Sequence, residues 1–206
     1  MQKILSRVQE LYNKNLTSVE KGFIDGIVEH INRNKKLTKR HFNGLSNIEN
    51  RYTEKSLAKR KAWLDQWDSK KSTISSVLAN YYYKKQVYLY GISYAILYNN
   101  YIPTQKEYNK MIGNKWAKKV LKSYFSEPLY PVGSLVLFRG GFYTDGYLGR
   151  FHLHQLRNAL ALVLGIGEVP IISACKGSKV YRVLPCGSAN SIYVEERHLK
   201  KVKKSS

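Results

Sequence analysis

The chain has 206 residues, which is enough for one large domain or two small ones. It carries 35 Lys and Arg against 14 Asp and Glu, a formal net charge of +21, and its hydrophobic fraction of 43% suffices for a core. Such a large excess of positive charge makes a folded chain repel itself unless an anionic partner lies close by. A polyanion is therefore the expected partner. The longest apolar run, residues 160–166, is too short to span a bilayer, and two cysteines exclude a disulfide framework.

Residues 1–126 are predicted to be helical, because apolar residues recur there at three- and four-residue steps. Thr17 with Glu20, and Thr104 with Glu107, have the spacing of capping boxes, in which two side chains satisfy unpaired backbone N–H groups at a helix start. After Thr53 the pattern predicts one long helix, or a pair of helices broken in the polar stretch 69–76. The other predicted helices cover residues 2–14 and 115–125 or begin near Thr17, Thr38, Val87 and Thr104.

After Pro131 the sequence changes to short β-type runs separated by turn residues. Residues 153–164 fit a helix or a buried strand equally well, and 140–149 are a Gly-rich loop. Four or five short antiparallel strands predict an SH3-like barrel. The predicted fold class is therefore α+β, with a basic helical domain over residues 1–126 and a small SH3-like antiparallel β-barrel domain over residues 131–203. The predicted strands cover residues 132–139, 169–174, 179–184 and 191–194.

Two groups of motifs in this sequence resemble those of known proteins. The first is residues 19–24 with Leu37, Thr38, Leu45, Ile48 and Arg51, and the second is residues 131–136, 176–184 and 194–201. The first group is similar to a small helical module of T4-type bacteriophage proteins, some of them linked to replication and recombination, although Gly22 stands where that module usually has a Trp. The second group resembles the SH3-like tails of uncharacterised proteins from large tailed phages. The resemblance implies an accessory protein and assigns no catalytic residue.

Basic residues gather in three clusters, which are candidates for phosphate contacts because Lys and Arg neutralise phosphates with release of counterions. A single cluster of this kind is as typical of an ordinary solvated helix face as of a binding surface. The net charge of the whole chain is harder to explain by solvated helix faces alone. The clusters are Arg33, Lys35, Lys36, Lys39 and Arg40; Lys55, Lys59, Arg60 and Lys61; and Lys106, Lys110, Lys115, Lys118, Lys119 and Lys122.

The chain has 17 tyrosines, whose rings are able to stack on exposed bases. Tyr82 and Tyr88 are the candidates for such contacts. Tyr90, Tyr94, Tyr98 and Tyr101 are spaced at helical intervals, which favours a place in the core.

Residues of the types that bind zinc occur in the C-terminal part, at His152, His154, Cys175 and Cys186. Their spacing contains no Cys-x-x-Cys or His-x-x-x-His pair, so we expect no metal and expect the two cysteines to be small buried side chains. The glycines at 165 and 167 lack the rest of a dinucleotide fingerprint. We therefore expect no cofactor and no catalytic residue.

The sequence predicts a non-enzymatic bacteriophage accessory protein that binds DNA or RNA largely without sequence specificity. One alternative is an interaction protein that docks on a host or phage polymerase or ribosome, with a protein partner in a replication, transcription or translation complex. Another is a DNA-associated virion component. The N-terminus lacks the order of a secretory signal, so we expect a cytoplasmic protein, in the host cell if it is viral, with no membrane partner.

Overall fold

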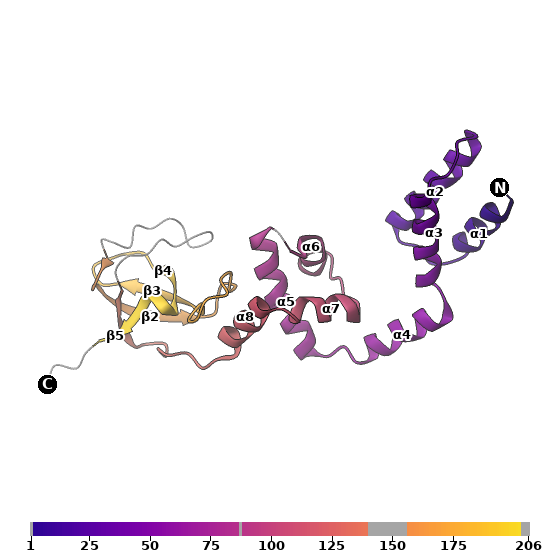
Figure 1. The fold of residues 1–206 in the computed structure, drawn as a ribbon. Helices are drawn as coiled ribbons and strands as arrows, with labels where there is room; N and C mark the ends of the chain where they lie inside the picture. Colours follow the sequence, from indigo (N-terminus) through magenta and orange to yellow (C-terminus); the bar gives the residue numbers. More distant parts are fainter. Residues whose placement is uncertain (1, 87, 140–155, 203–206) are drawn as a thin grey trace. The chain divides into compact units, whose positions relative to one another are not determined.

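The computed structural model describes residues 2–86, 88–139 and 156–202, and within these ranges the chain is an α+β protein (Figure 1). Eight described helices precede a five-stranded antiparallel sheet. The helices are α1 (Gln2–Tyr12), α2 (Ser18–Asn32), α3 (Lys39–Arg51), α4 (Glu54–Asp65), α5 (Ser69–Lys85), α6 (Tyr90–Tyr98), α7 (Gln105–Ile112) and α8 (Lys115–Phe125). The strands are β1 (Leu135–Phe138), β2 (Leu160–Ile166), β3 (Val180–Pro185), β4 (Ile192–Glu195) and β5 (Leu199–Lys201).

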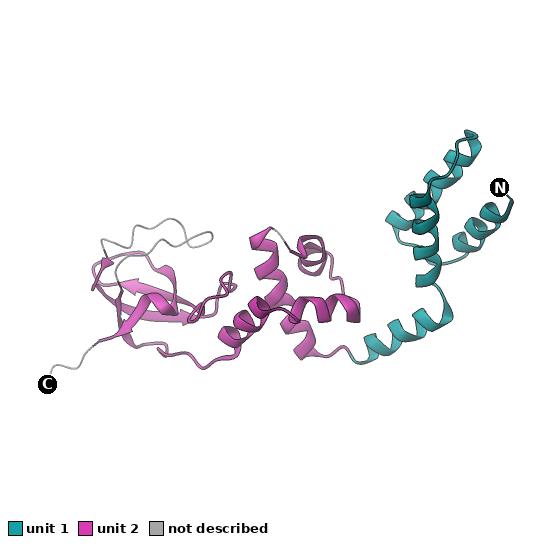
Figure 2. Ribbon diagram, viewed as in Figure 1, with its two compact units in different colours: residues 1–66 teal, residues 67–206 magenta. Residues whose placement is uncertain are grey.

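The chain divides into two compact units, residues 1–66 and residues 67–206 (Figure 2). In the first unit the two expected caps are present, because Thr17 and Thr38 each accept a hydrogen bond from the third backbone N–H of the following helix. The apolar stripes of α1, α2 and α3 meet in a small core that includes Leu11, Ile24 and Leu45. Local capping and one buried stripe per helix are thus enough to build this unit.

The segment after Thr53 forms two helices, α4 and α5, so the paired alternative is confirmed. The expected break within residues 69–76 is wrong, because the break lies at 66–68. Asp68 explains the position: its Oδ1 accepts a hydrogen bond from the Lys71 N–H at 2.7 Å and so caps α5. The serine-rich residues that follow form the first turns of that helix.

The second unit contains helices α5 to α8 and the sheet. The helices pack around a core in which Leu78, Met111 and Val120 are completely buried. The cap at Thr104 is confirmed, and Asn114 caps α8 by accepting hydrogen bonds from the Trp116 and Ala117 N–H groups. This cap fixes where the basic helix α8 begins.

The strand order of the sheet is β4-β3-β2-β1-β5, with every neighbouring pair antiparallel. Its buried face carries Val136, Phe138, Val163 and Tyr181, and β2 alternates strictly between buried and half-buried positions. For residues 153–164 the sequence fitted a helix or a buried strand, and the structure shows that 160–164 are part of a strand. In the described part of the chain β4 and β5 are the two edges of the sheet, which is open.

The expected strand at residues 169–174 is wrong, because these residues have no regular secondary structure. Ile171 is 5% exposed and belongs to the core of α5 and α8, and Ala174 packs against that core. The apolar side chains of this segment thus cover helices instead of completing the sheet. No helix among the described residues is long and apolar enough to cross a membrane.

Helix gives way to sheet between Phe125 and Leu135, inside the second unit. The Leu129 N–H donates to Glu196 Oε2 at 3.2 Å, and the Tyr130 hydroxyl donates to the Leu199 carbonyl at 3.1 Å. These bonds tie residues 129 and 130 to the sheet. The domain boundary at 126–131 stays a prediction, and residues 140–149 lie outside the described ranges.

Limited digestion by subtilisin tests that boundary. We expect the first cuts at 126–131, where Ser126, Glu127 and Leu129 are exposed between helix and sheet, or at 140–149, where the Gly-rich sequence predicts a loop. Mass spectrometry of the early fragments locates the cuts. First cleavage at residues 66–68 would instead show that the two compact units are the independently folded parts.

Candidate nucleic-acid interface

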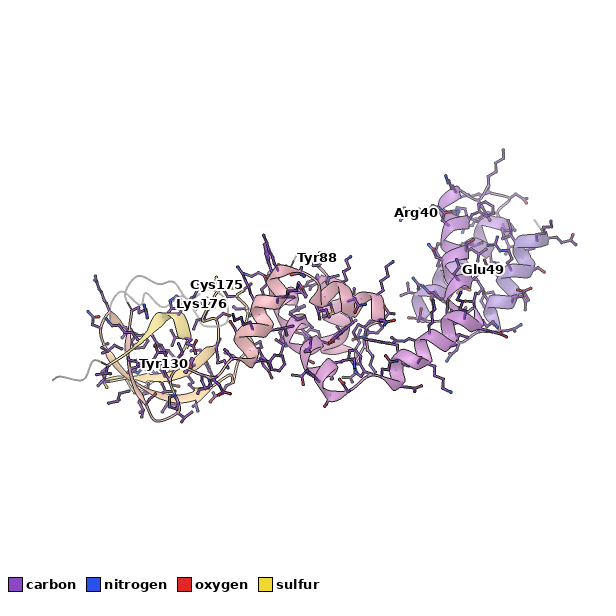
Figure 3. All side chains as sticks on the ribbon, turned by 60° about the horizontal axis from the view of Figure 1, so that its bottom comes forward. Arg40, Glu49, Tyr88, Tyr130, Cys175 and Lys176 are labelled. Atoms are coloured by element: carbon purple, nitrogen blue, oxygen red, sulfur yellow. The ribbon has the colours of Figure 1, made fainter. Side chains whose placement is uncertain are left out.

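The first basic cluster lies on the link between α2 and α3 and on the first turn of α3. Arg33 caps the end of α2 and pairs with Glu29, with 2.5 Å between Nη2 and Oε1. In Figure 3, Arg40 lies on α3 well separated from Glu49. Cations at a helix N-terminus oppose the helix dipole, so their presence is not explained by the stability of α3. Within the described ranges, four members are exposed and have no carboxylate partner within 4 Å: Lys35, Lys36, Lys39 and Arg40.

Replacing these four residues together by alanine tests the cluster. We expect weaker binding to every nucleic-acid sequence alike, and a salt dependence shallower by about 0.7 per single-strand phosphate contact that is lost. The free energy of unfolding should barely change, because exposed charges of one sign contribute little to stability. Fluorescence anisotropy with two unrelated oligonucleotides measures the first effect, and urea unfolding measures the second. A loss confined to one oligonucleotide would contradict the phosphate interpretation.

The second cluster lies on α4, where Lys55, Lys59 and Lys61 are exposed and Arg60 is half-buried. A helix turns about 100° per residue, so Lys55 and Lys59 share a face while Lys61 lies on the other side. The structure therefore does not bring this cluster together on one surface.

The third cluster is divided between two helices, because Lys106 and Lys110 lie on α7. The other four members form the exposed face of α8: Lys115, Lys118, Lys119 and Lys122. Their spacing of three and four residues places them along one side of the helix. The opposite side is buried at Ala117, Val120 and Ser123. In residues 2–86, 88–139 and 156–202 none of these lysines has a carboxylate within 4 Å. The charge of this face is therefore not neutralised by the protein.

A groove of about 790 Å³ lies beside this face, and we call it the α5–α8 groove. It is bordered by the end of α5, by Tyr88, by the first turns of α8 and by the loop at residues 173–175. Figure 3 shows Tyr88 and, on that loop, Cys175 with Lys176 next to it. Among the described residues that line the groove, three are lysines, four are aromatic and none is acidic. These residues are Tyr81, Tyr82, Lys85, Tyr88, Asn114, Lys115, Trp116, Lys119, Ser173, Ala174 and Cys175.

Two aromatic side chains of the groove are open to solvent: Tyr88 is 44% exposed and Trp116 is 42% exposed. Lys115 Nζ lies 4.1 Å from the centre of the Trp116 ring, and Lys110 Nζ lies 5.2 Å from the centre of the Tyr88 ring. Such cation–π contacts are attractive and keep a flexible lysine beside the ring. Positive charge and exposed aromatic surface therefore lie together.

Tyr82 borders the same groove but is only 3% exposed. Its hydroxyl donates to the Met111 carbonyl at 2.7 Å and accepts from the Asn114 amide, and its ring meets the Tyr88 ring edge-on at 5.8 Å. Burial raises the pKa of the Tyr82 hydroxyl. Tyr82 thus anchors the wall of the groove and orients Tyr88, while a contact of Tyr82 with nucleic acid stays a prediction.

The structure brings together four of the predicted residues, Tyr82, Tyr88, Lys115 and Lys119. Sequence reasoning missed Lys85 and Trp116. A lysine directly before Trp116 was the available signal, but Trp116 is also four residues from the core residue Val120, a spacing typical of a buried stripe.

The expectation that Tyr90, Tyr94 and Tyr98 belong to the core is wrong, since they are 41%, 45% and 58% exposed. Helix α6 packs on the helical core through Ile92 and its other aliphatic residues, so its tyrosines face outward. They gather around Tyr83, whose ring stacks on that of Tyr90 at 5.2 Å and 15°.

The expectation of buried cysteines is also wrong. Cys175 and Cys186 are both exposed, because Cys175 lies in the loop at the groove and Cys186 lies in the turn after β3. His152 and His154, the other two candidate zinc ligands, lie outside the described residues.

No family model, curated protein or solved structure matches this chain.

Proposed function

We propose that this chain binds DNA or RNA with little sequence preference and acts as a binding protein, not as an enzyme. The observation that carries the proposal is the α5–α8 groove together with the basic face of α8. Three lysines surround two exposed aromatic rings there, with no acidic residue among the described lining. Lysines with no carboxylate partner attract phosphates by charge, and displacing the counterions of the nucleic acid drives binding.

The kind of cation present supports a lack of sequence preference. The rigid planar side chains Arg, Asn and Gln are well suited to bidentate contacts with bases in the major groove, whereas Lys is a flexible point charge suited to phosphate. The charged residues of α8 are all lysines. Contacts of this type position a protein on the backbone and carry no sequence information.

For the sheet we propose an SH3-like barrel. Strand β5 returns to pair with β1, so the first and last strands of the sheet are neighbours, which supports this proposal. A buried hydrogen bond also links β3 to the segment before β5, because the Tyr181 hydroxyl donates to Glu196 Oε2 at 2.7 Å. On the phage-like motifs alone, we place the chain among accessory proteins that act in the cytoplasm of a bacterial host.

Binding by the purified full-length chain tests the proposal. We expect fluorescence anisotropy to detect binding to labelled single-stranded DNA, duplex DNA and RNA of 20 nucleotides, with log affinity falling linearly against log salt. If about five phosphates are neutralised, the slope should be about −3.5 on single strands and about −4.5 on duplex. A salt-independent affinity would contradict the proposal. Nucleic-acid binding seen only with a polymerase or ribosome present would favour the docking alternative, and co-purification with particles would favour a virion component.

A further inference from the structure

We infer that the α5–α8 groove takes an unpaired strand, whose bases stack on Trp116 and Tyr88 while its phosphates meet Lys85, Lys115 and Lys119. The inference rests on the proposed function and names its substrate class as single-stranded nucleic acid.

The exposed rings are the first reason. Trp116 and Tyr88 are exposed by 42% and 44% and both border the groove, so aromatic surface is open to a ligand there. A base offers an aromatic ring its flat face only when the base is unstacked, and in a duplex the neighbouring base pairs cover that face. Stacking on aromatic side chains is accordingly how proteins bind single strands without reading sequence.

The position of the lysines is the second reason. Lys85 comes from the end of α5, whereas Lys115 and Lys119 come from the first turns of α8, so cations border the groove from both helices. A strand that passes between the two helices therefore meets positive charge on each side while its bases reach the rings. The volume of about 790 Å³ is in the range of small-ligand sites, which suits one or a few flexible nucleotides.

Substitution of the indole tests stacking directly. In the full-length chain we expect Trp116→Ala to weaken binding to a 15-residue oligothymidylate about tenfold or more, while a hairpin duplex of the same length changes less than threefold. Trp116→Phe should restore most of the loss, because it keeps an aromatic face. The salt slope should stay the same in both variants, since no charge is changed.

The matched control is Phe125→Ala, which removes another exposed ring of α8, 55% exposed and outside the groove. We expect it to leave both affinities unchanged. Tryptophan fluorescence adds a direct readout, because a base stacked on an indole quenches its emission. Quenching on adding oligothymidylate should be lost in Trp116→Phe, because neither of the other two tryptophans, Trp63 and Trp67, borders the groove.

The two exposed cysteines give an independent footprint. Cys175 borders the groove, whereas Cys186 lies in the turn after β3, so each wild-type molecule contains its own control. Saturating oligothymidylate should slow alkylation of Cys175 by N-ethylmaleimide at least fivefold and leave Cys186 unchanged. Peptide mass spectrometry measures the two rates separately.

The results separate the two proposals. Equal affinity for hairpin and oligothymidylate, with no effect of Trp116→Ala on either, would overturn the single-strand inference and leave general nucleic-acid binding standing. Equal alkylation of Cys175 with and without bound oligothymidylate would also overturn the inference. No binding of any nucleic acid at low salt would overturn both.

Discussion

Replacing the four lysines of α8 by alanine is expected to lower the affinity for a single-stranded oligonucleotide roughly 600-fold at 0.1 M salt. Each neutralised phosphate of a single strand contributes about 0.7 to the salt slope, so four lost contacts make the slope shallower by about 2.8. At 1 M salt such contacts are screened, so the variant and the wild type should bind about equally. Lowering the salt tenfold, to 0.1 M, then separates their affinities by a factor of 10 to the power 2.8, which is roughly 600. Anisotropy titrations at four salt concentrations measure both quantities.

The control variant removes the same charge from elsewhere on the surface. Lys3, Lys14, Lys21 and Lys201 are exposed and belong to none of the three clusters. Their replacement by alanine should weaken binding only by the small long-range effect of net charge. Both variants should unfold at nearly the wild-type urea concentration, since alanine is a good helix former and exposed lysines contribute little to stability. An equal loss of affinity in the two variants would show that the net charge of the chain, and not the position of the lysines on α8, determines the affinity for nucleic acid.

The features that could be predicted from the sequence are those set by neighbouring residues. Thr17 with Glu20 and Thr104 with Glu107 marked helix starts correctly, because a capping box needs only a four-residue segment. The start of α8 at Lys115 was also predicted, and the structure shows Asn114 as its N-cap.

Where the choice depended on tertiary packing, the same reasoning failed. Residues 169–174 have the composition of a strand, yet Ile171 is buried against helices. Helical spacing showed that Tyr90, Tyr94 and Tyr98 share a face of α6, but not which face of α6 is covered. Periodicity groups side chains, and only the packing partner decides which group is buried.

The candidate site follows the same division. Lys115, Lys119 and Tyr88 were predicted one by one from charge and aromatic character. Their meeting with the loop at 173–175 could not be predicted, because it depends on the way this loop packs on α5 and α8. Trp116 was missed because its spacing fits the core stripe of α8.

The second large effect concerns stability at low pH and centres on Glu20, which is 6% exposed in the first unit. Burial by itself raises the pKa of this carboxyl, but hydrogen bonds from the Thr17 N–H and hydroxyl, from Tyr52 and from Arg51 lower the pKa to about 2 overall. The bond from the Tyr52 hydroxyl measures 2.8 Å and that from Arg51 Nη1 measures 2.9 Å. Glu20 thus joins α2 to the end of α3 as a buried anion.

Because the pKa of Glu20 is lower in the folded state than its ordinary value of 4.5, its contribution is complete above pH 4.5 and is lost as the pH falls toward 2. The contribution is about 3 kcal/mol. We expect Glu20→Gln to destabilise the first unit by most of that amount at pH 7 and by little at pH 2. Urea unfolding of the full-length chain, followed through the NMR amide signals of α2 and α3, measures the first unit separately.

Glu29→Gln is the matched control, because Glu29 also lies on α2 and pairs with an arginine, but its side chain is 58% exposed. Exposed pairs of this kind contribute under about 1 kcal/mol, so this variant should unfold almost like the wild type at every pH. If Glu20→Gln followed the wild-type loss of stability between pH 4.5 and 2, a carboxyl other than Glu20 would be responsible for it. The hydrogen bonds of Glu20 with Thr17, Tyr52 and Arg51 would then not be what links α2 to α3 at neutral pH.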